Sequence, residues 1–354
     1  MQYQSLHINN FRGIEELEIN DMRQLNLLVG RNNCGKSSIL EALFLLSGMS
    51  NPQLPVNIHN FRNILLIKDD DFRYIFRDQN FSYPVEIKGI IENESRSLTI
   101  SPILDSNQQQ LFEDLIPQNS ISKNEDISRS TYFDKQVKGL NLVFQNQLDE
   151  SYEAQISLNE GKVRFIKKYI EKLKCTYLNN QTIMNGLDLR MESLIVDKKI
   201  NDLITTLKKI EPNIIDIRMG PGDIIYIDLG KEKLFPVNIM GDGIRRIMAM
   251  VAAIYELKNA VLLIDEIENG LHYSSLMIMW KAIFAACKQY NVQLFATTHS
   301  YECIETFSKI YNQENPTGDD IRLYRIDKDV NKHKAYIYTP QVLIEAQKSN
   351  FEVR

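Results

Sequence analysis

The segment GRNNCGKS, residues 30–37, restricts the fold of this chain more than any other. The apolar stretch LNLLV precedes it, and the helix-like run KSSILEALFLL follows and can end at Gly48. A buried strand, a loop that fits GxxxxGK[ST] and a helix together predict a phosphate-binding loop. Glycines let backbone N–H groups surround a phosphate, and the helix N-terminus adds positive potential. We therefore expect an α/β domain that binds a nucleotide.

The residue types in this loop suit a nucleotide with a magnesium ion. Lys36 can reach the β and γ phosphates and assist catalysis there, and the Ser37 hydroxyl can ligate Mg²⁺. The loop would contact the phosphates through Gly30, Asn32, Asn33, Cys34, Gly35, Lys36, Ser37 and Ser38. The alternative is a chance match, and the flanking strand and helix argue against it.

A second apolar run, residues 261–264, ends in Asp265 and Glu266. A carboxylate at the C-terminal end of a buried strand lies where an α/β sheet binds its ligand. We expect Asp265 to hold Mg²⁺, and Glu266 to orient or deprotonate the attacking water. Taken alone, the pair could be an acidic helix cap after an ordinary strand. The phosphate loop favours the catalytic interpretation.

Two weaker features point to the same phosphate. The apolar strand LFATT ends shortly before His299, whose imidazole could hydrogen-bond a γ-phosphate. A lone histidine at a strand end is more often structural, but its place after the acidic pair favours a catalytic role. The turn MGDGIRR, residues 240–246, precedes a helix and suits anion binding, although GDG alone also fits an ordinary turn.

Composition excludes several classes of protein. Hydrophobic residues make up 44% of the 354 positions and charged residues 25%, as in ordinary globular proteins. The net charge of −5 argues against a generally basic nucleic-acid-coating protein, but allows a local basic groove. We find neither an apolar run long enough to span a membrane nor a signal-peptide pattern. The four cysteines form no CxxC pair, which indicates a reducing cytoplasm with neither disulfides nor zinc.

Period-two alternation dominates the first half of the chain outside the phosphate loop. Short strands are predicted within the first thirty residues, with a turn at NNFRGI. The polar segment 105–136 is a long excursion with at most one short helix. Two β-hairpins are predicted on either side of it, and they pair 85–91 with 97–103 and 139–146 with 152–159.

Helical spacing returns in the second half. Apolar residues recur at Ile166, Ile170, Leu173 and Tyr177, and again over 200–210, so we predict a helical insertion. A hairpin follows at the Gly-Pro-Gly turn near residue 221. The final third alternates helices with apolar strands, which favours a parallel α/β sheet.

In order and spacing, five motifs resemble those of ABC-type ATPases of the SMC/RecF/OLD group, especially the bacterial families AAA-15 and AAA-21. The motifs are NNFRGI (9–14), GRNNCGKSS (30–38), MGDGIRR (240–246), LLIDEIENGLH (262–272) and ATTHS (296–300). The resemblance implies an α/β P-loop ATPase head with a mixed or parallel core sheet, an antiparallel β subdomain and a helical arm. It divides the chain into an N-terminal lobe (1–50), a variable β-rich region (51–160), the arm (161–212) and a C-terminal lobe (213–354).

The resemblance also implies an assembly. Such ATPases form head-to-tail homodimers, or higher homo-oligomers, that enclose two ATP molecules with Mg²⁺ between subunits. Gly241, Asp242 and Gly243 would then reach the γ-phosphate held by the partner subunit, and Asn269 and His272 would lie at the interface. Aspartate at the middle position of this signature resembles the RecF/OLD side of the group and departs from transporter ATPases.

Within one subunit, the resemblance gives Arg12 a contact with the nucleotide and His299 the role of a switch at the γ-phosphate. The group also has a Q-loop glutamine, and the sequence does not decide whether Gln53 or Gln79 takes this place. OLD proteins carry a TOPRIM nuclease after the ATPase, and too few residues follow His299 for that domain. We therefore expect any nuclease partner to be a separately encoded chain, as in anti-phage systems such as PARIS.

Three functions compete at this point. The first is a cytoplasmic ATPase switch, with no membrane contact, whose ATP-closed dimer controls a DNA or protein effector in phage defence. The second is a RecF-like clamp in DNA repair, in which ATP sets how long the protein stays on DNA. The third is a nucleotide-binding scaffold with little turnover.

Overall fold

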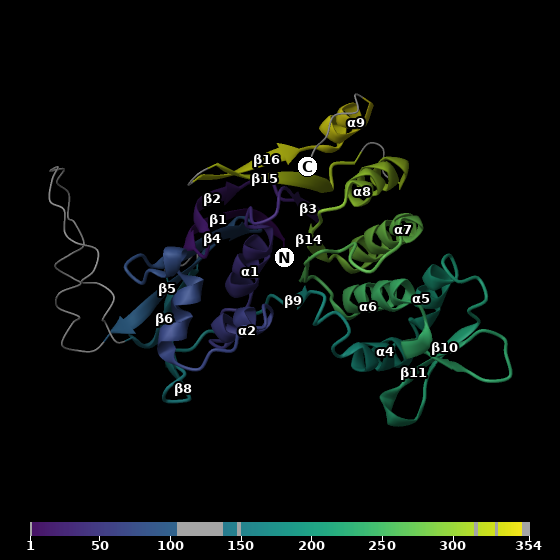
Figure 1. Ribbon diagram of the computed structural model, residues 1–354, viewed down its shortest axis with the longest axis horizontal. Helices are drawn as coiled ribbons and strands as arrows, with labels where there is room; N and C mark the ends of the chain where they lie inside the picture. Colours follow the sequence, from purple (N-terminus) through teal and green to yellow (C-terminus); the bar gives the residue numbers. More distant parts are fainter. Residues whose placement is uncertain (1, 105–136, 147–149, 315–317, 330–331, 349–354) are drawn as a thin grey trace.

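Two large sheets pack against the helix that follows the phosphate loop, α1 (Lys36–Ser47) (Figure 1). α1 contacts strands of both sheets, so it lies between them. The predicted helix and its end at Gly48 are confirmed. The structure, a computed structural model, describes residues 2–104, 137–146, 150–314, 318–329 and 332–348.

The first sheet carries the site at one of its edges. Among the described residues its strands follow the order β16-β15-β3-β14-β13-β9, parallel from β15 to β9 and antiparallel only between β15 and β16. The predicted parallel core is therefore confirmed. The strands are β3 (Leu25–Val29), β9 (Cys175–Leu178), β13 (Val261–Ile264), β14 (Gln293–Thr297), β15 (Ile321–Asp329) and β16 (Lys332–Tyr338).

Successive side chains of a strand point to opposite faces of the sheet, and the inner strands of this sheet are packed against a hydrophobic core on each face. In β3, Leu27 and Val29 enter the core that the helices of the C-terminal half cover, whereas Leu28 enters the core around α1. In β13, Leu262 and Leu263 divide in the same way. The continuous apolar runs in the sequence follow from this burial on two sides.

The second sheet is antiparallel and covers the other side of α1. Its strand order is β2-β1-β4-β5-β6-β7-β8, and it lies on the left of Figure 1. Both predicted hairpins, β4–β5 and β6–β7, are confirmed, whereas the predicted excursion at 105–136 lies outside the described residues. The strands are β1 (Tyr3–Phe11), β2 (Ile14–Ile19), β4 (Val85–Ile91), β5 (Glu94–Leu104), β6 (Val137–Asn146), β7 (Ser151–Ser157) and β8 (Lys162–Lys167).

A helical lobe packs on the C-terminal half, on the right of Figure 1. Its helices α4 (Leu187–Val196) and α5 (Ile200–Leu207) contact α6 (Asp242–Glu256). The helix predicted over 200–210 is confirmed as α5, and the predicted hairpin as β10–β11. The lobe's small sheet consists of β10 (Asp216–Met219), β11 (Ile225–Asp228) and β12 (Phe235–Pro236).

The other helices are short or cover the core sheet. Within the described part of the chain, no helix combines the length and the apolar character that crossing a membrane requires. The remaining helices are α2 (Leu54–Asn60), α7 (Tyr273–Tyr290), α8 (Tyr301–Glu314) and α9 (Pro340–Lys348), with 3₁₀ turns at Asp69–Ile75, Arg77–Gln79, Pro221–Asp223 and Val237–Ile239.

The helix predicted over residues 166–177 is wrong. The chain there leaves β8 and enters β9, which pairs in parallel with β13 at the edge of the core sheet. Two of the four apolar residues that suggested a helix are surface residues, since Ile166 is 55% and Ile170 75% exposed. Pairing with a distant strand therefore decided the structure of this segment, and a local spacing pattern does not contain that information.

A buried glutamine joins the two sheets. Gln293, fully buried at the start of β14, accepts a hydrogen bond from the Tyr3 N–H (2.7 Å) and donates to the carbonyls of Tyr3 and Arg23 (2.8 Å each). Its amide thereby satisfies the backbone of β1, a strand of the other sheet. Buried backbone groups without such partners would cost free energy.

We expect Gln293→Leu to lower the free energy of unfolding by about 2–4 kcal/mol, because the buried N–H and carbonyl of Tyr3 both lose their side-chain partner, whereas the Arg23 carbonyl still accepts from Asn26. Urea unfolding followed by circular dichroism measures this change. Gln289→Leu, at an exposed position of α7, is the matched control and should change stability by less than about 0.5 kcal/mol. Equal midpoints for the two variants would contradict the bridging role.

Candidate active site

The phosphate loop connects β3 to α1 and has a backbone shape that requires glycine at its first position. Gly30 has φ 137°, and a Cβ there would lie 2.3 Å from the Ile326 carbonyl oxygen of β15. Gly35, the N-cap of α1, has φ 96°, and no side chain caps the helix. The first turn of α1 also lacks acidic residues. Its N–H groups and positive potential are therefore directed to the loop, as phosphate binding requires.

Lys36 folds back over the loop. Its Nζ donates hydrogen bonds to the carbonyls of Gly30 and Arg31, at 2.9 Å each, and lies 3.7 Å from Cys34 Sγ. Only 5% of the residue is exposed, and this burial lowers the pKa of Lys36. Asn32 and Asn33, between these contacts, are exposed. An ammonium group held over a ring of backbone groups suits the β and γ phosphates.

The sequence-predicted metal ligands meet in the structure. Ser37 Oγ donates to Asp265 Oδ1 at 3.1 Å, although 228 residues separate them. The same oxygen accepts from Thr297 Oγ1 at 2.6 Å, and Oδ2 accepts from the Tyr177 hydroxyl at 3.2 Å. Burial, and then the Asp265 charge, raise the pKa of Tyr177 well above its usual range, so this hydroxyl remains a donor.

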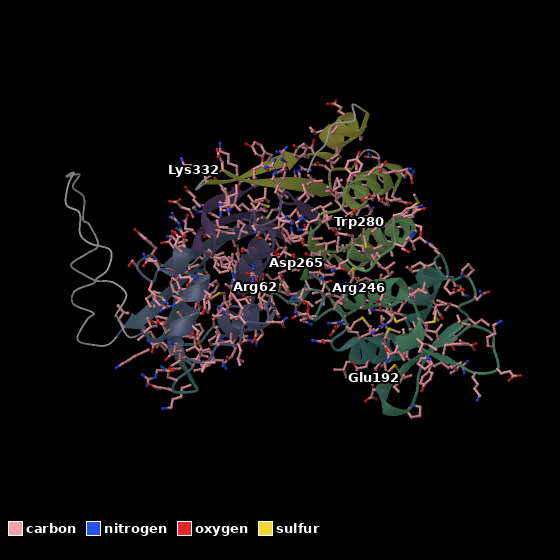
Figure 2. The ribbon with its side chains drawn as sticks, in the orientation of Figure 1. Arg62, Glu192, Arg246, Asp265, Trp280 and Lys332 are labelled. Atoms are coloured by element: carbon pink, nitrogen blue, oxygen red, sulfur yellow. The ribbon has the colours of Figure 1, made fainter. Side chains whose placement is uncertain are left out.

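The chemistry of this pair fits Mg²⁺. A hydroxyl oxygen and a carboxylate oxygen are hard ligands, and magnesium sites near nucleotides commonly have one or two protein ligands plus phosphate and water. Among the described residues, no group of three or more His, Cys, Asp or Glu side chains forms a separate metal cage. Asp265 lies near the centre of the molecule in Figure 2.

Glu266 lies beside Asp265 in a left-handed backbone conformation, with φ 54°. Its N–H donates to Thr297 Oγ1 at 2.8 Å. Its carboxylate oxygen Oε2 accepts from Asn180 Nδ2 at 2.9 Å and from Asn269 Nδ2 at 3.2 Å. The structure thus places the predicted base next to the predicted metal ligand and holds it by two amides.

The signature and the histidine lie at exposed positions. Gly241 is the N-cap of α6, and a Cβ there would meet no atom within 4 Å, while Asp242 accepts from Arg245 at 3.2 Å. Gly243 approaches Leu271 in the loop that follows β13. His299 is exposed two residues after β14, and its N–H donates to Glu268. Their contacts with phosphate stay predictions.

Arg12 is held inside the protein. In the turn between β1 and β2 it has φ 53°, and its Nε lies 2.6 Å from a carboxylate oxygen of Glu41, a buried residue of α1. Glu41 also pairs with Arg62 at 2.6 Å, and Arg62 reaches Ser38 Oγ at 3.4 Å. Arg12 therefore anchors α1, and its contact with nucleotide stays a prediction.

Several site residues escaped the sequence analysis. Tyr177 and Asn180 lie at the carboxyl end of β9, so reading CTYL as a strand would have identified both as candidates, because ligands bind at such ends. Arg62 has no comparable signal, since it enters the site from a turn. Arg246 ends the predicted signature motif MGDGIRR, but the motif gave this arginine no role of its own. Among the described residues, neither Gln53 nor Gln79 hydrogen-bonds to Asp265 or Glu266, and the choice between the two glutamines stays open.

Comparison with known proteins places this geometry in context. A family model described as an AAA ATPase domain, AAA-15, matches residues 1–304. A protein of Helicobacter pylori named ATP/GTP phosphatase is 25% identical over 356 residues, which cover 88% of this chain and 89% of the relative.

Solved structures share the fold at low sequence identity. An Smc head bound to the C-terminal winged-helix domain of ScpA is 12% identical, with a TM-score of 0.51 and coverage of 98% of this chain and all of that one. An Smc head with an extended coiled coil, bound to the C-terminal domain of ScpA derived from Pyrococcus furiosus, also has a TM-score of 0.51, at 10% identity and 98% and 99% coverage. The described chain thus has the fold of an SMC head.

We expect Lys36→Ala to weaken ATP binding by at least about a hundredfold, because it removes the ammonium group at the β and γ phosphates. Isothermal titration calorimetry with ATP and Mg²⁺ measures this loss. Lys288→Ala, at an exposed position of α7, is the matched control and should bind ATP as the unaltered chain does. Undiminished affinity in Lys36→Ala would exclude the loop as the phosphate site.

Proposed function

This chain belongs to the AAA-15 family of AAA ATPase domains, as its five motifs predicted, and we propose that it works as an ATP-driven dimer switch. The observation that carries the proposal is the convergence of Ser37 and Asp265, 3.1 Å apart, beside Lys36 and Glu266. This set unites a phosphate loop, a pair of Mg²⁺ ligands and a base. A nucleotide-binding scaffold would not need the last of these.

In the proposed mechanism, the loop and the N-terminus of α1 bind the phosphates, and Lys36 neutralises charge at the β and γ oxygens. Ser37 and Asp265 would hold Mg²⁺, which supplies charge neutralisation during phosphoryl transfer. Glu266 accepts the proton of a water whose oxygen attacks the γ phosphorus. The bond between the γ phosphorus and the oxygen that bridges it to the β phosphate breaks, and ADP and phosphate leave.

The exposed parts of the site support a second subunit. The N-terminus of α6 lacks a side-chain cap and opens at the surface at Gly241 and Asp242. Tyr273, next to the predicted interface residue His272, is 70% exposed, and its ring is tilted against the His272 ring, with the two ring centroids 4.3 Å apart. Uncapped N–H groups, and an exposed aromatic pair at the end of the loop that carries Glu266, suit a contact with another copy of this chain.

We extend the proposal to the output of the switch, a separately encoded protein effector in phage defence, with a TOPRIM-type nuclease as the leading candidate. Both Smc heads of this fold are bound to domains of ScpA, which supports a protein partner for this chain. Purification of the chain together with proteins from neighbouring genes tests this output. ATP-enhanced, salt-sensitive DNA binding without a protein partner would instead favour the RecF-like clamp.

We expect Glu266→Gln to lower the rate of phosphate release by at least about a hundredfold while ATP still binds, because the amide cannot accept the proton. Under ATP and Mg²⁺, light scattering coupled to size exclusion should then show the mass of a stable dimer. Turnover at the original rate would exclude Glu266 as the base. Lost turnover with a purely monomeric mass would contradict the dimer switch.

A further inference from the structure

Asn180 contacts both the catalytic carboxylate and the helix that begins at the signature. Its Nδ2 donates to Glu266 Oε2 at 2.9 Å, and its Oδ1 accepts from Arg246 at 2.9 Å. An asparagine amide has one accepting and one donating end, and a guanidinium can only donate. The bond to Arg246 therefore fixes which end of the Asn180 amide faces Glu266.

Arg246 reaches this position because a glycine allows close approach. Gly270, in the loop after β13, has φ 70°, and a Cβ there would lie 2.7 Å from Arg246 Nε. The guanidinium thus lies against the loop that carries Glu266 and Asn269, while its backbone belongs to the first turns of α6. Figure 2 labels Arg246 and Asp265, both near the centre of the view.

The two amides bind the same oxygen of Glu266. Asn180 and Asn269 both donate to Oε2, at 2.9 and 3.2 Å. Two donors on one oxygen restrict the position of the carboxylate. Among the described residues no hydrogen bond reaches its second oxygen, Oε1, which keeps its lone pairs for a proton. This arrangement positions a base without neutralising it, because amide donors carry no net charge.

We propose that Arg246 and Asn180 form a positioning relay that sets the carboxylate of Glu266 from the N-terminal turns of α6 in the same subunit. The inference rests on the proposed role of Glu266 as the base. In this relay Arg246 acts through its hydrogen bond to Asn180, so a shift of α6 relative to β9 changes the direction of the Glu266 carboxylate. Both are positioning residues, and neither is assigned a contact with ATP of its own subunit.

A double-mutant cycle tests the relay. We expect Asn180→Ala and Arg246→Ala each to lower kcat about tenfold with little change in KM for ATP, because phosphate binding is untouched. The double variant should be no slower than Asn180→Ala alone, since in the relay the effect of Arg246 on Glu266 passes through Asn180. Phosphate release at saturating ATP measures kcat, and thermal unfolding checks that each variant is folded.

A shape-conserving variant gives an independent readout. Asn180→Asp keeps the contact with Arg246 but replaces the donor facing Glu266 with a second carboxylate. We expect a larger loss of kcat than in Asn180→Ala, with KM for ATP again little changed, because a carboxylate in place of the amide repels Glu266 where the amide donated a hydrogen bond to it. Arg190→Ala, which breaks an ion pair with Glu256 on the same lobe, is the matched control and should leave kcat and KM unchanged.

The outcomes separate the two proposals. If Arg246→Ala lowers kcat by the same factor in the unaltered chain and in the Asn180→Ala variant, the relay is wrong. Arg246 would then act directly, for example across the subunit interface. A kcat in Asn180→Asp that is no lower than in Asn180→Ala would overturn it as well. Full turnover in Glu266→Gln contradicts the proposed function itself. If Glu266→Gln is inactive but the kcat losses of Asn180→Ala and Arg246→Ala multiply in the double variant, only the relay is contradicted.

Discussion

The carboxylate of Asp265 is the acceptor on which this site depends. Three hydroxyls donate to it, from Ser37 after β3, Thr297 at the end of β14 and Tyr177 in β9. The strand order β3-β14-β13-β9 brings these carboxyl ends to one edge, with β13 between β14 and β9. A hydrogen bond to a charged group contributes about 1.5–3 kcal/mol, so one acidic residue can fix four chain segments relative to one another.

The phosphate loop owes its position to packing on both sides of α1. The core sheet lies on one side and the antiparallel sheet on the other, and the helix is apolar over most of its length. Glu41 is the buried carboxylate of this helix, and its burial requires the two guanidinium groups of Arg12 and Arg62. Removing one partner of such a buried ion pair is costly, so the triad holds α1, and with it Lys36 and Ser37, in one register.

Local sequence patterns predicted those parts of the site that lie within one short segment of the chain. The phosphate loop and the Asp265-Glu266 pair each follow an apolar strand directly, so strand, turn and chemistry could be predicted together. Tyr177 and Asn180 could not be predicted, because their place depends on the pairing of β9 with β13, some 85 residues further along the chain. The same pairing explains why the helical spacing at Ile166 and Ile170 was misleading.

Two consecutive carboxylates serve different parts of the protein because the chain turns between them. Asp265 ends β13 and bonds hydroxyls of the core sheet, whereas Glu266, at φ 54°, faces Asn180 and Asn269. A left-handed residue other than glycine costs about 1–3 kcal/mol. The bond from the Glu266 N–H to Thr297 Oγ1 offsets part of this cost, and the same hydroxyl donates to Asp265. Thr297 therefore couples the proposed metal ligand to the proposed base. A glycine at position 266 would relieve the backbone strain, but it would also remove the carboxylate that faces Asn180 and Asn269.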